Sequence, residues 1–211
     1  MPGSSVEFIY FDMGNVLLRF DHERAVQAVA RATGAPASLV RHVIFGSGLE
    51  LRYERGELST DEFHEEFCRR TDSSLSMDEL VWACSDIFEP IDAMHELVRQ
   101  LKLGGHRLGV LSNTCDAHWR FVYPERYAEL WSHFERFALS FELRSLKPEP
   151  DIYRQAATLA EVVPERIFFV DDRDENVDAA RRAGFDAVLF TTAGQLSGEL
   201  RARGLMSSEI P

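Results

Sequence analysis

The stretch Phe8-Ile9-Tyr10-Phe11-Asp12-Met13-Gly14-Asn15-Val16-Leu17-Leu18 decides how this chain folds. Its first part is a continuous apolar run that ends in the carboxylate of Asp12, and a glycine stands two residues later. A short apolar run of this kind predicts a strand that is buried on both faces, as in a parallel sheet. Open α/β sheets bind their ligands at the carboxyl ends of such strands. We therefore expect Asp12 to lie at the functional edge of a sheet.

The remaining strands are predicted from four further apolar runs. With the first run, Val6–Phe11, they make five strands, the others being Leu108–Leu111, Phe137–Ser140, Ile167–Val170 and Ala187–Phe190. Each of these four runs follows a stretch with helical periodicity, which indicates βαβ crossovers. The fold class that follows is α/β, with a doubly wound parallel sheet.

The interval between the first two runs is nearly 100 residues long and contains no convincing strand. Two segments in it, Ser59-Thr60-Asp61-Glu62 and Ser76-Met77-Asp78-Glu79, fit the capping box that begins a helix. Apolar residues after them recur at helical spacing. We therefore expect an inserted helical cap domain over residues 20–90, and an α/β core domain formed by residues 1–19 and 91–211.

Composition limits the classes of partner. The 211 residues carry a formal net charge of −12, and no basic run is longer than two residues, so nucleic acids and anionic membranes are not expected partners. No apolar stretch approaches the roughly 20 residues that span a bilayer. Residues 1–5 lack the basic and apolar regions of a signal peptide. The expectation is a cytoplasmic enzyme, monomeric or homodimeric, that acts on a small molecule.

Four segments place polar residues at the carboxyl ends of the predicted strands. They are Asp12-Met13-Gly14-Asn15, Leu111-Ser112-Asn113-Thr114, Lys147-Pro148-Glu149-Pro150, and Asp171-Asp172 with Asn176. A carboxylate can attack a phosphoryl group, and paired carboxylates with a backbone carbonyl suit Mg²⁺. A hydroxyl and a lysine supply donors and positive charge for phosphate oxygens. The combination predicts phosphoryl transfer through an aspartyl phosphate.

In order and sequence, these four segments resemble the haloacid dehalogenase superfamily, and the long helical interval resembles the cap of its dehalogenase-like branch. Together with Tyr53-Glu54-Arg55-Gly56-Glu57-Leu58-Ser59 and Arg144-Ser145-Leu146, they resemble the bacterial α-D-glucose-1-phosphate phosphatases and their relatives. The resemblance covers nearly the whole chain. It implies a Rossmann-like core with strand order 5-4-1-2-3 and a Mg²⁺-dependent phosphatase. It further implies a small sugar phosphate such as α-D-glucose 1-phosphate as the substrate.

The resemblance also implies roles for matching positions. Asp12 is expected to be the nucleophile and a Mg²⁺ ligand, and Gly14 to contribute its backbone carbonyl to the metal. Asp172 is expected to bind the metal, with Asp171 beside it holding the metal's water or Lys147. Three residues are expected to bind the transferring phosphoryl group: Ser112, Asn113 and Lys147. Lys147 is also expected to be catalytic, because it neutralises charge between the phosphate and the nucleophile.

Position 14 departs from the family pattern. Family phosphatases usually carry a second aspartate there, which protonates the leaving oxygen and later activates water. General acid–base catalysis of this kind is worth about 10²–10⁴-fold. Three explanations stay open. In the first, Asp21 or His22 takes the place of the missing acid. In the second, the leaving group needs little protonation, as in an anomeric sugar phosphate. In the third, the protein is a slow or inactive enzyme.

Two other classes stay open. A metal-independent 2-haloacid dehalogenase would use the same Asp12 nucleophile on carbon. The pair Asp171-Asp172 argues against it, because a metal-free site that binds a carboxylate substrate has no use for two further anions. A non-catalytic protein that binds a phosphometabolite would show Mg²⁺-dependent binding and no phosphate release.

Overall fold

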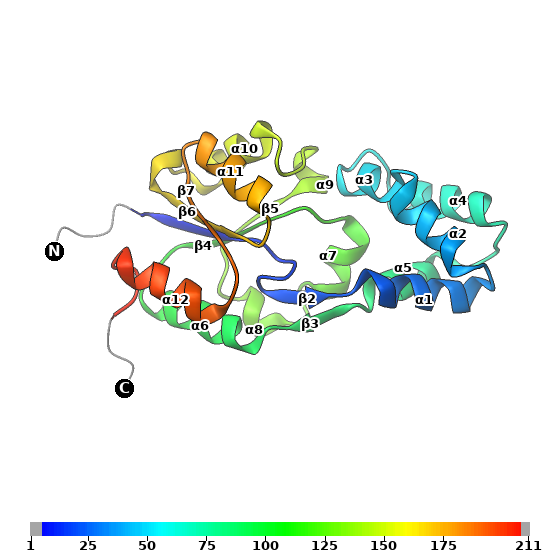
Figure 1. Cartoon of the computed structure of the whole chain (residues 1–211), viewed down its shortest axis with the longest axis horizontal. Helices are drawn as coiled ribbons and strands as arrows, with labels where there is room; N and C mark the ends of the chain where they lie inside the picture. The colour runs from blue at the N-terminus through cyan, green and yellow to red at the C-terminus, as the bar shows by residue number, and fades with distance from the viewer. Residues whose placement is uncertain (1–5, 208–211) are drawn as a thin grey trace.

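The computed structural model describes residues 6–207, which form a sheet covered by helices and, beside it, a separate group of helices (Figure 1). Residues 1–5, on which the expectation of a missing signal peptide rests, and residues 208–211 lie outside this range. Within residues 6–207, none of the helices has both the length and the apolar character that crossing a membrane requires.

The central sheet has five strands in the order β5-β4-β1-β6-β7, and all four neighbouring pairs are parallel. The strands are β1 (Phe8–Phe11), β4 (Leu108–Ser112), β5 (Arg136–Leu139), β6 (Ile167–Asp171) and β7 (Asp186–Leu189). Numbered along the chain, this is the predicted order 5-4-1-2-3. The predicted parallel α/β sheet is therefore confirmed.

The first strand, β1, can occupy the centre of the sheet, where both of its faces are buried, because each of its side chains is apolar or forms a hydrogen bond. All four residues of β1 are buried, and the Tyr10 hydroxyl donates a hydrogen bond to the Ala156 carbonyl at 2.9 Å. Gly109 on β4 leaves room for the aromatic rings of β1, since a Cβ there would lie 2.5 Å from Cε1 of Tyr10. This close packing fixes the end of β1, where Asp12 follows.

Helices cover both faces of the sheet (Figure 1). On one face lie α6 (Asp92–Leu103), α7 (Asp116–Val122), α8 (Ala128–Trp131) and α12 (Ala193–Ala202), whose apolar residues share one core cluster with the sheet. On the other face lie α10 (Pro150–Ala160) and α11 (Asp174–Arg182), which contribute to a second cluster. Two short helices, α9 (Ser140–Leu143) and the 3₁₀-helix η2 (Pro164–Arg166), connect these elements. The sheet is thus doubly wound.

Residues 20–90, here called the helical segment, contain the second group of helices. These are α1 (His22–Thr33), α2 (Ala37–Arg41), the π-helix η1 (His42–Gly46), α3 (Leu49–Glu54), α4 (Thr60–Thr71) and α5 (Met77–Ser85). They pack around an apolar cluster of their own, which Cys115 and Ala117 of the core complete. Both predicted capping boxes, at Ser59 and Ser76, are present.

One expectation about this segment is wrong, because it begins and ends in a short antiparallel ribbon. Strand β2 (Leu18–Phe20) pairs with β3 (Phe88–Pro90), so that the chain enters and leaves the helices side by side. Each strand has three residues, which is below the length that an alternating or apolar pattern needs to indicate a strand. Their pairing also joins distant parts of the sequence, so no local signal predicts it.

Candidate functional site

Asp12 lies directly after β1, where its backbone N–H donates to the Val170 carbonyl at 2.9 Å. Its Oδ1 accepts hydrogen bonds from the Met13 N–H at 2.7 Å and from the Lys147 ammonium at 3.0 Å. Burial raises the pKa of Asp12, while the charge of Lys147 lowers it and that of Asp171 raises it further. A buried carboxylate of this kind is poorly solvated, which favours it as a nucleophile once a cation holds it ionised.

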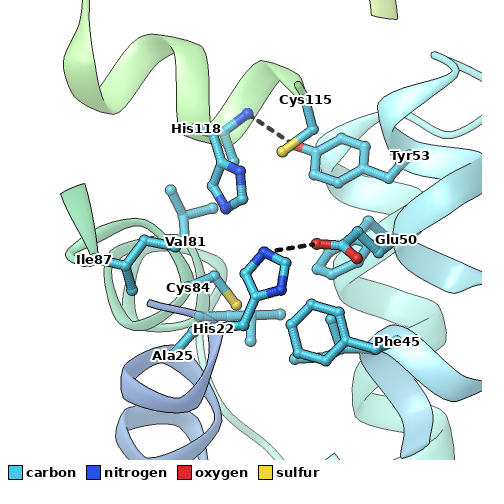
Figure 2. A pocket seen from close by; sticks show the side chains of 14 residues that line it. His22, Ala25, Phe45, Glu50, Tyr53, Val81, Cys84, Ile87, Cys115 and His118 are labelled. Carbon is cyan, nitrogen blue, oxygen red and sulfur yellow. Dashed lines mark hydrogen bonds and ion pairs between the residues drawn. The ribbon is translucent and has the colours of Figure 1, made fainter. Parts of the chain in front are cut away.

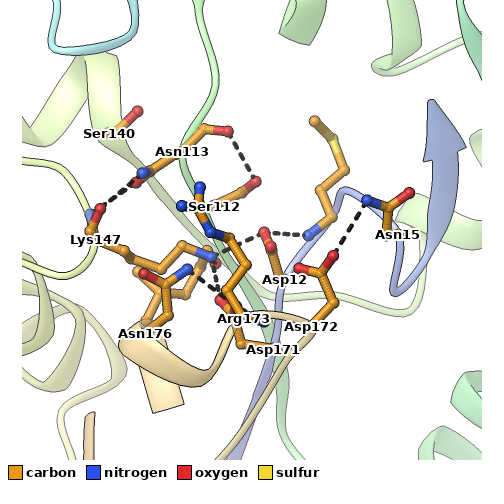
Figure 3. Close-up of polar contacts among 12 residues, drawn as sticks. Asp12, Asn15, Ser112, Asn113, Ser140, Lys147, Asp171, Asp172, Arg173 and Asn176 are labelled. Carbon is orange, nitrogen blue, oxygen red and sulfur yellow. Dashed lines mark hydrogen bonds and ion pairs between the residues drawn. The ribbon is translucent and has the colours of Figure 1, made fainter. Parts of the chain in front are cut away.

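Lys147 is the buried cation at the centre of the site (Figure 3). Besides Asp12, its Nζ contacts Asp171 Oδ2 at 2.6 Å and donates to the Leu111 carbonyl at 3.0 Å. Burial lowers the pKa of Lys147, but the negative charges of Asp12 and Asp171 outweigh this effect and raise it. The lysine therefore keeps its positive charge beside the predicted nucleophile.

Asp171 is held on both of its oxygens. Oδ2 faces Lys147, whereas Oδ1 accepts from the Arg173 N–H at 2.9 Å and from Nδ2 of Asn176 at 3.0 Å. The residue is fully buried. With these partners, Asp171 is placed to orient Lys147, which is one of the two roles that the sequence predicts for it.

Asp172 faces the loop after β1 from the opposite side. Its Oδ2 accepts from Nδ2 of Asn15 at 3.1 Å, as Figure 3 shows. Asn15 adopts a left-handed backbone with φ of 55°, and its N–H donates to the Leu18 carbonyl at 2.7 Å. No role is predicted for Asn15 from the sequence, although an Asn after a Gly is a common signal for such a turn. Asn15 thus ties the two loops of the site together.

The three carboxylates fit a divalent cation. Asp12, Asp171 and Asp172 each offer an oxygen, and these oxygens lie within 4.8 Å of one another. One buried lysine cannot balance three carboxylates, and burial raises the pKa of both Asp12 and Asp172. A hard dication with oxygen ligands would offset this repulsion. Gly14, the predicted backbone ligand, lies in the same loop as Asp12.

Ser112 and Asn113 end and follow β4, next to Lys147. The Ser112 hydroxyl donates a hydrogen bond to the Asn113 carbonyl at 3.3 Å, and its interaction with Asp12 lowers the pKa of that carboxyl. The side-chain amide of Asn113 is committed to the Lys147 backbone, since it donates to the carbonyl at 2.9 Å and accepts from the N–H at 2.8 Å. Asn113 therefore clamps the lysine loop, and its predicted phosphate contact stays a prediction.

A residue that the sequence analysis did not single out, Ser140, joins the helical segment to this edge. Its hydroxyl donates to the Glu54 carbonyl at 2.6 Å and lies 2.9 Å from both the N–H and the carbonyl of Thr114. Ser140 is the last residue of the third predicted strand and directly follows β5, so a small polar residue at the carboxyl end of a strand was the available signal. Its hydroxyl holds the end of α3 against the loop that carries Ser112 and Asn113.

A small cavity of about 40 Å³ opens beside Gly14. Its lining includes Met13, Gly14, Phe20, Glu54 and Asn113. The Phe20 ring occupies the place of a side chain at position 14, because a Cβ on Gly14 would lie 2.6 Å from Cε1 of Phe20. The expected second aspartate is thus replaced by an aromatic ring from β2.

The two substitute acids suggested by the sequence are differently placed. Asp21 caps α1, where its Oδ1 accepts from the Glu23 N–H at 2.8 Å and from the Arg24 N–H at 3.4 Å. His22 lines the cavity beside Gly14. It also lines a neighbouring pocket, drawn in Figure 2, where its ring is stacked on Phe45 and its Nε2 faces Glu50 at 3.9 Å. Asp21 is therefore occupied as a helix cap, and His22 faces another carboxyl.

The substitution Gly14→Asp is expected to lower the free energy of unfolding by about 1–3 kcal/mol, because the new side chain overpacks the space that Phe20 fills. The ring has little room to move, since it also packs against His22 and Phe88. Urea denaturation of Gly14→Asp and of Gly14→Asp with Phe20→Leu measures the effect. The second change should restore part of the loss, and an equal loss in both proteins would contradict this interpretation.

Known proteins are similar to this chain over most of its length. A family model described as haloacid dehalogenase-like hydrolase matches residues 6–184. A D-ribitol-5-phosphate phosphatase from Bacteroides thetaiotaomicron is 28% identical over 186 residues, covering 86% of this chain and 90% of that protein.

Solved structures agree with the fold. A haloacid dehalogenase family enzyme from Bacteroides thetaiotaomicron, in complex with magnesium and inorganic phosphate, superposes with a TM-score of 0.78 at 25% identity. The match covers 88% of this chain and 94% of that one. A hydrolase of the same family from Porphyromonas gingivalis gives a TM-score of 0.82 at 24% identity, covering 94% and 99% of the two chains.

Proposed function

Because the chain belongs to the haloacid dehalogenase-like hydrolase family, we propose that it is a Mg²⁺-dependent phosphatase acting on the phosphate monoester of a small sugar or sugar alcohol. The observation that carries the proposal is the buried contact of Lys147 with both Asp12 and Asp171, next to the third carboxylate, Asp172. Catalysis of phosphoryl transfer consists mostly of positioning the reactants and stabilising charge, and this arrangement of charged residues can do both.

Asp12 is the nucleophile of the proposed reaction. An oxygen of Asp12 attacks phosphorus in line with the leaving alcohol, and an aspartyl phosphate forms that water then hydrolyses. Lys147 stays charged and stabilises the phosphoryl oxygens, while Asp171 holds it in place. Mg²⁺ bound by Asp12, Asp172 and the Gly14 carbonyl would add positive charge at the same oxygens.

Ser112 and Asn113 are proposed to contact the phosphoryl group from the β4 side. Ser112 does so through its hydroxyl, which already faces Asp12. Asn113 does so through its backbone N–H, because its side chain holds the Lys147 loop. Backbone N–H groups are effective donors to phosphate oxygens.

The helical segment, residues 20–90, is proposed to act as a cap domain on the core formed by residues 1–19 and 91–211. Its own apolar cluster supports this division. The cavity beside Gly14, at about 40 Å³, holds only a few water molecules. A sugar leaving group therefore requires the segment to move away from the core and to close again over the substrate.

The D-ribitol-5-phosphate phosphatase relative supports a sugar or alditol phosphate as the substrate. The proposed substrate class therefore includes alditol phosphates as well as sugar phosphates such as α-D-glucose 1-phosphate. A dehalogenase is disfavoured because Asp172 and Asp171 would add negative charge beside a carboxylate substrate. A protein that only binds phosphometabolites is disfavoured because Asp12 and Lys147 retain the contact that phosphoryl transfer needs.

Phosphate release from a panel of sugar and alditol phosphates, including α-D-glucose 1-phosphate and ribitol 5-phosphate, tests the proposal. We expect release that requires Mg²⁺, is lost in EDTA and returns when Mg²⁺ is added in excess, because the clustered carboxylates need the cation. Retained hydrolysis in EDTA would contradict the metal site. Mg²⁺-dependent binding without release would favour the non-catalytic alternative.

A further inference from the structure

The site lacks a proton donor at position 14, and another group in the same cavity offers one. We propose that Glu54, the last residue of α3, is the catalytic acid and base that serves the leaving group in place of an aspartate at position 14. This inference rests on the phosphatase function proposed above. It places the proton chemistry on the helical segment rather than on the loop after β1.

The first support is position. Glu54 lines the cavity that also contains Met13, Gly14 and Asn113. These three residues come from the two loops that carry the predicted nucleophile and the predicted phosphate contacts. Glu54 therefore lines the same cavity as position 14, where the expected aspartate would have acted.

The second support is that residues 54–56 are held against the core at three points. Ser140 donates to the Glu54 carbonyl at 2.6 Å. Arg55 pairs with Glu149, two residues after Lys147, at 2.6 Å. Gly56 approaches the Phe141 carbonyl so closely that no Cβ fits there. When the helical segment is closed on the core, these contacts fix the backbone of Glu54 relative to the sheet edge, as proton transfer to a bound substrate requires.

The third support is the charge environment of Glu54. Burial raises the pKa of Glu54, and the negative charge of Asp12 raises it further, whereas Lys147 and Arg173 lower it. Asp12, Lys147 and Arg173 of the phosphoryl site thus act on Glu54, and Glu50 on the same helix interacts with it as well. A carboxyl group with a raised pKa can carry a proton near neutral pH, which is what a general acid needs.

Neighbouring groups are less suited to this role. His22 shares the cavity, but the charges that act on it are those of Asp21 and Arg41, and its Nε2 faces Glu50 (Figure 2). His118 also lines the cavity, and burial lowers its pKa to about 4, so at neutral pH its ring is neutral and too weak an acid to protonate a leaving group. Glu54 is the group on which Asp12 and Lys147 act directly.

The proposed steps balance. As Asp12 Oδ bonds to phosphorus, the bond from phosphorus to the alcohol oxygen breaks, and that oxygen takes the proton from the Glu54 carboxyl. The Glu54 carboxylate then takes a proton from water, whose oxygen attacks phosphorus. The bond between Asp12 and phosphorus breaks, inorganic phosphate leaves, and Glu54 is again protonated.

The variant Glu54→Gln tests these steps with two substrates in Mg²⁺. Turnover of ribitol 5-phosphate, whose alkoxide needs a proton, is expected to fall by about 10²–10⁴-fold. With p-nitrophenyl phosphate, whose phenolate leaves without a proton, we expect a burst of about one product per active site followed by slow turnover, because hydrolysis of the aspartyl phosphate still needs a base. Acid-quenched samples should contain the phosphorylated protein by intact mass.

A matched control is Glu57→Gln, an exposed glutamate three residues away that pairs with Arg52 and Arg55. It should keep wild-type rates on both substrates. Glu54→Asp keeps a carboxyl and should recover part of the activity on ribitol 5-phosphate. If Glu54→Asp recovers activity and Glu54→Gln keeps the melting temperature of the wild type, the loss of activity in Glu54→Gln is due to the missing proton donor and not to unfolding.

Other results would overturn the proposal. An equal loss on both substrates without a burst, an increase in KM alone, or unchanged kinetics would each show that Glu54 is not the proton donor. No phosphate release by the wild-type protein from either substrate would overturn the phosphatase function itself, and this inference with it. Failure of the Glu54 variants alone leaves the phosphatase function standing.

Discussion

Replacing Asp12 with asparagine is expected to abolish phosphate release, by roughly 10³–10⁶-fold, which is the loss that follows removal of a catalytic nucleophile. The amide has the shape of the carboxylate but cannot form the bond to phosphorus. The folded protein should be as stable as the wild type, because Asp12 is a buried carboxyl whose ionised form is disfavoured. Lys147 keeps Asp171 as its partner in the variant.

The measurement is single-turnover phosphate release, with urea denaturation as the test of folding. Asp178→Asn, an exposed aspartate on α11 that pairs with Arg181, is the matched control and should retain the wild-type rate. A rate for Asp12→Asn near that of the wild type would show that Asp12 is not the nucleophile. The metal site alone would then have to explain the contact between Lys147 and Asp171.

Replacing Lys147 with methionine is expected to lower the free energy of unfolding by about 3–5 kcal/mol, because two buried carboxylates lose the buried cation that they share. Phosphate release should fall as well, by roughly 10²–10³-fold, since a fixed donor to the phosphoryl oxygens is lost. The side chain is 1% exposed, so water cannot replace the missing charge.

Urea denaturation in EDTA measures this effect without help from a bound cation. The double variant Lys147→Met with Asp171→Asn should recover part of the stability and none of the activity, because it removes the uncompensated charge but not the need for the lysine. Lys102→Met, at the other lysine of the chain, is the control and should change neither quantity. Full stability of Lys147→Met would contradict the charge balance described for the site.

Much of the core could be predicted because its signals are local. The five strands of the sheet are short apolar runs, and the polar residues that follow them appear directly in the sequence, as Asp12 and Asp171 do. The ribbon of β2 and β3 could not be predicted, because it pairs three-residue strands from opposite ends of the helical segment.

Side-chain contacts in the site that join distant parts of the sequence could not be predicted either. The sequence predicts that Asp12, Lys147 and Asp171 meet, since all three follow strands of one sheet. It does not predict that Asn113 closes on the Lys147 backbone, or that Ser140 reaches Glu54. These contacts join loops to side chains across long sequence separations, and no spacing rule describes them.

The Phe20 ring beside Gly14 also bears on how this sequence can change over generations. Regaining an aspartate at position 14 in one step places it 2.6 Å from the ring, and removing the ring first leaves an unfilled apolar gap. Both single steps lower stability before any gain in chemistry can be selected. The two positions therefore form an epistatic pair, and an aspartate at position 14 is hard to acquire one substitution at a time.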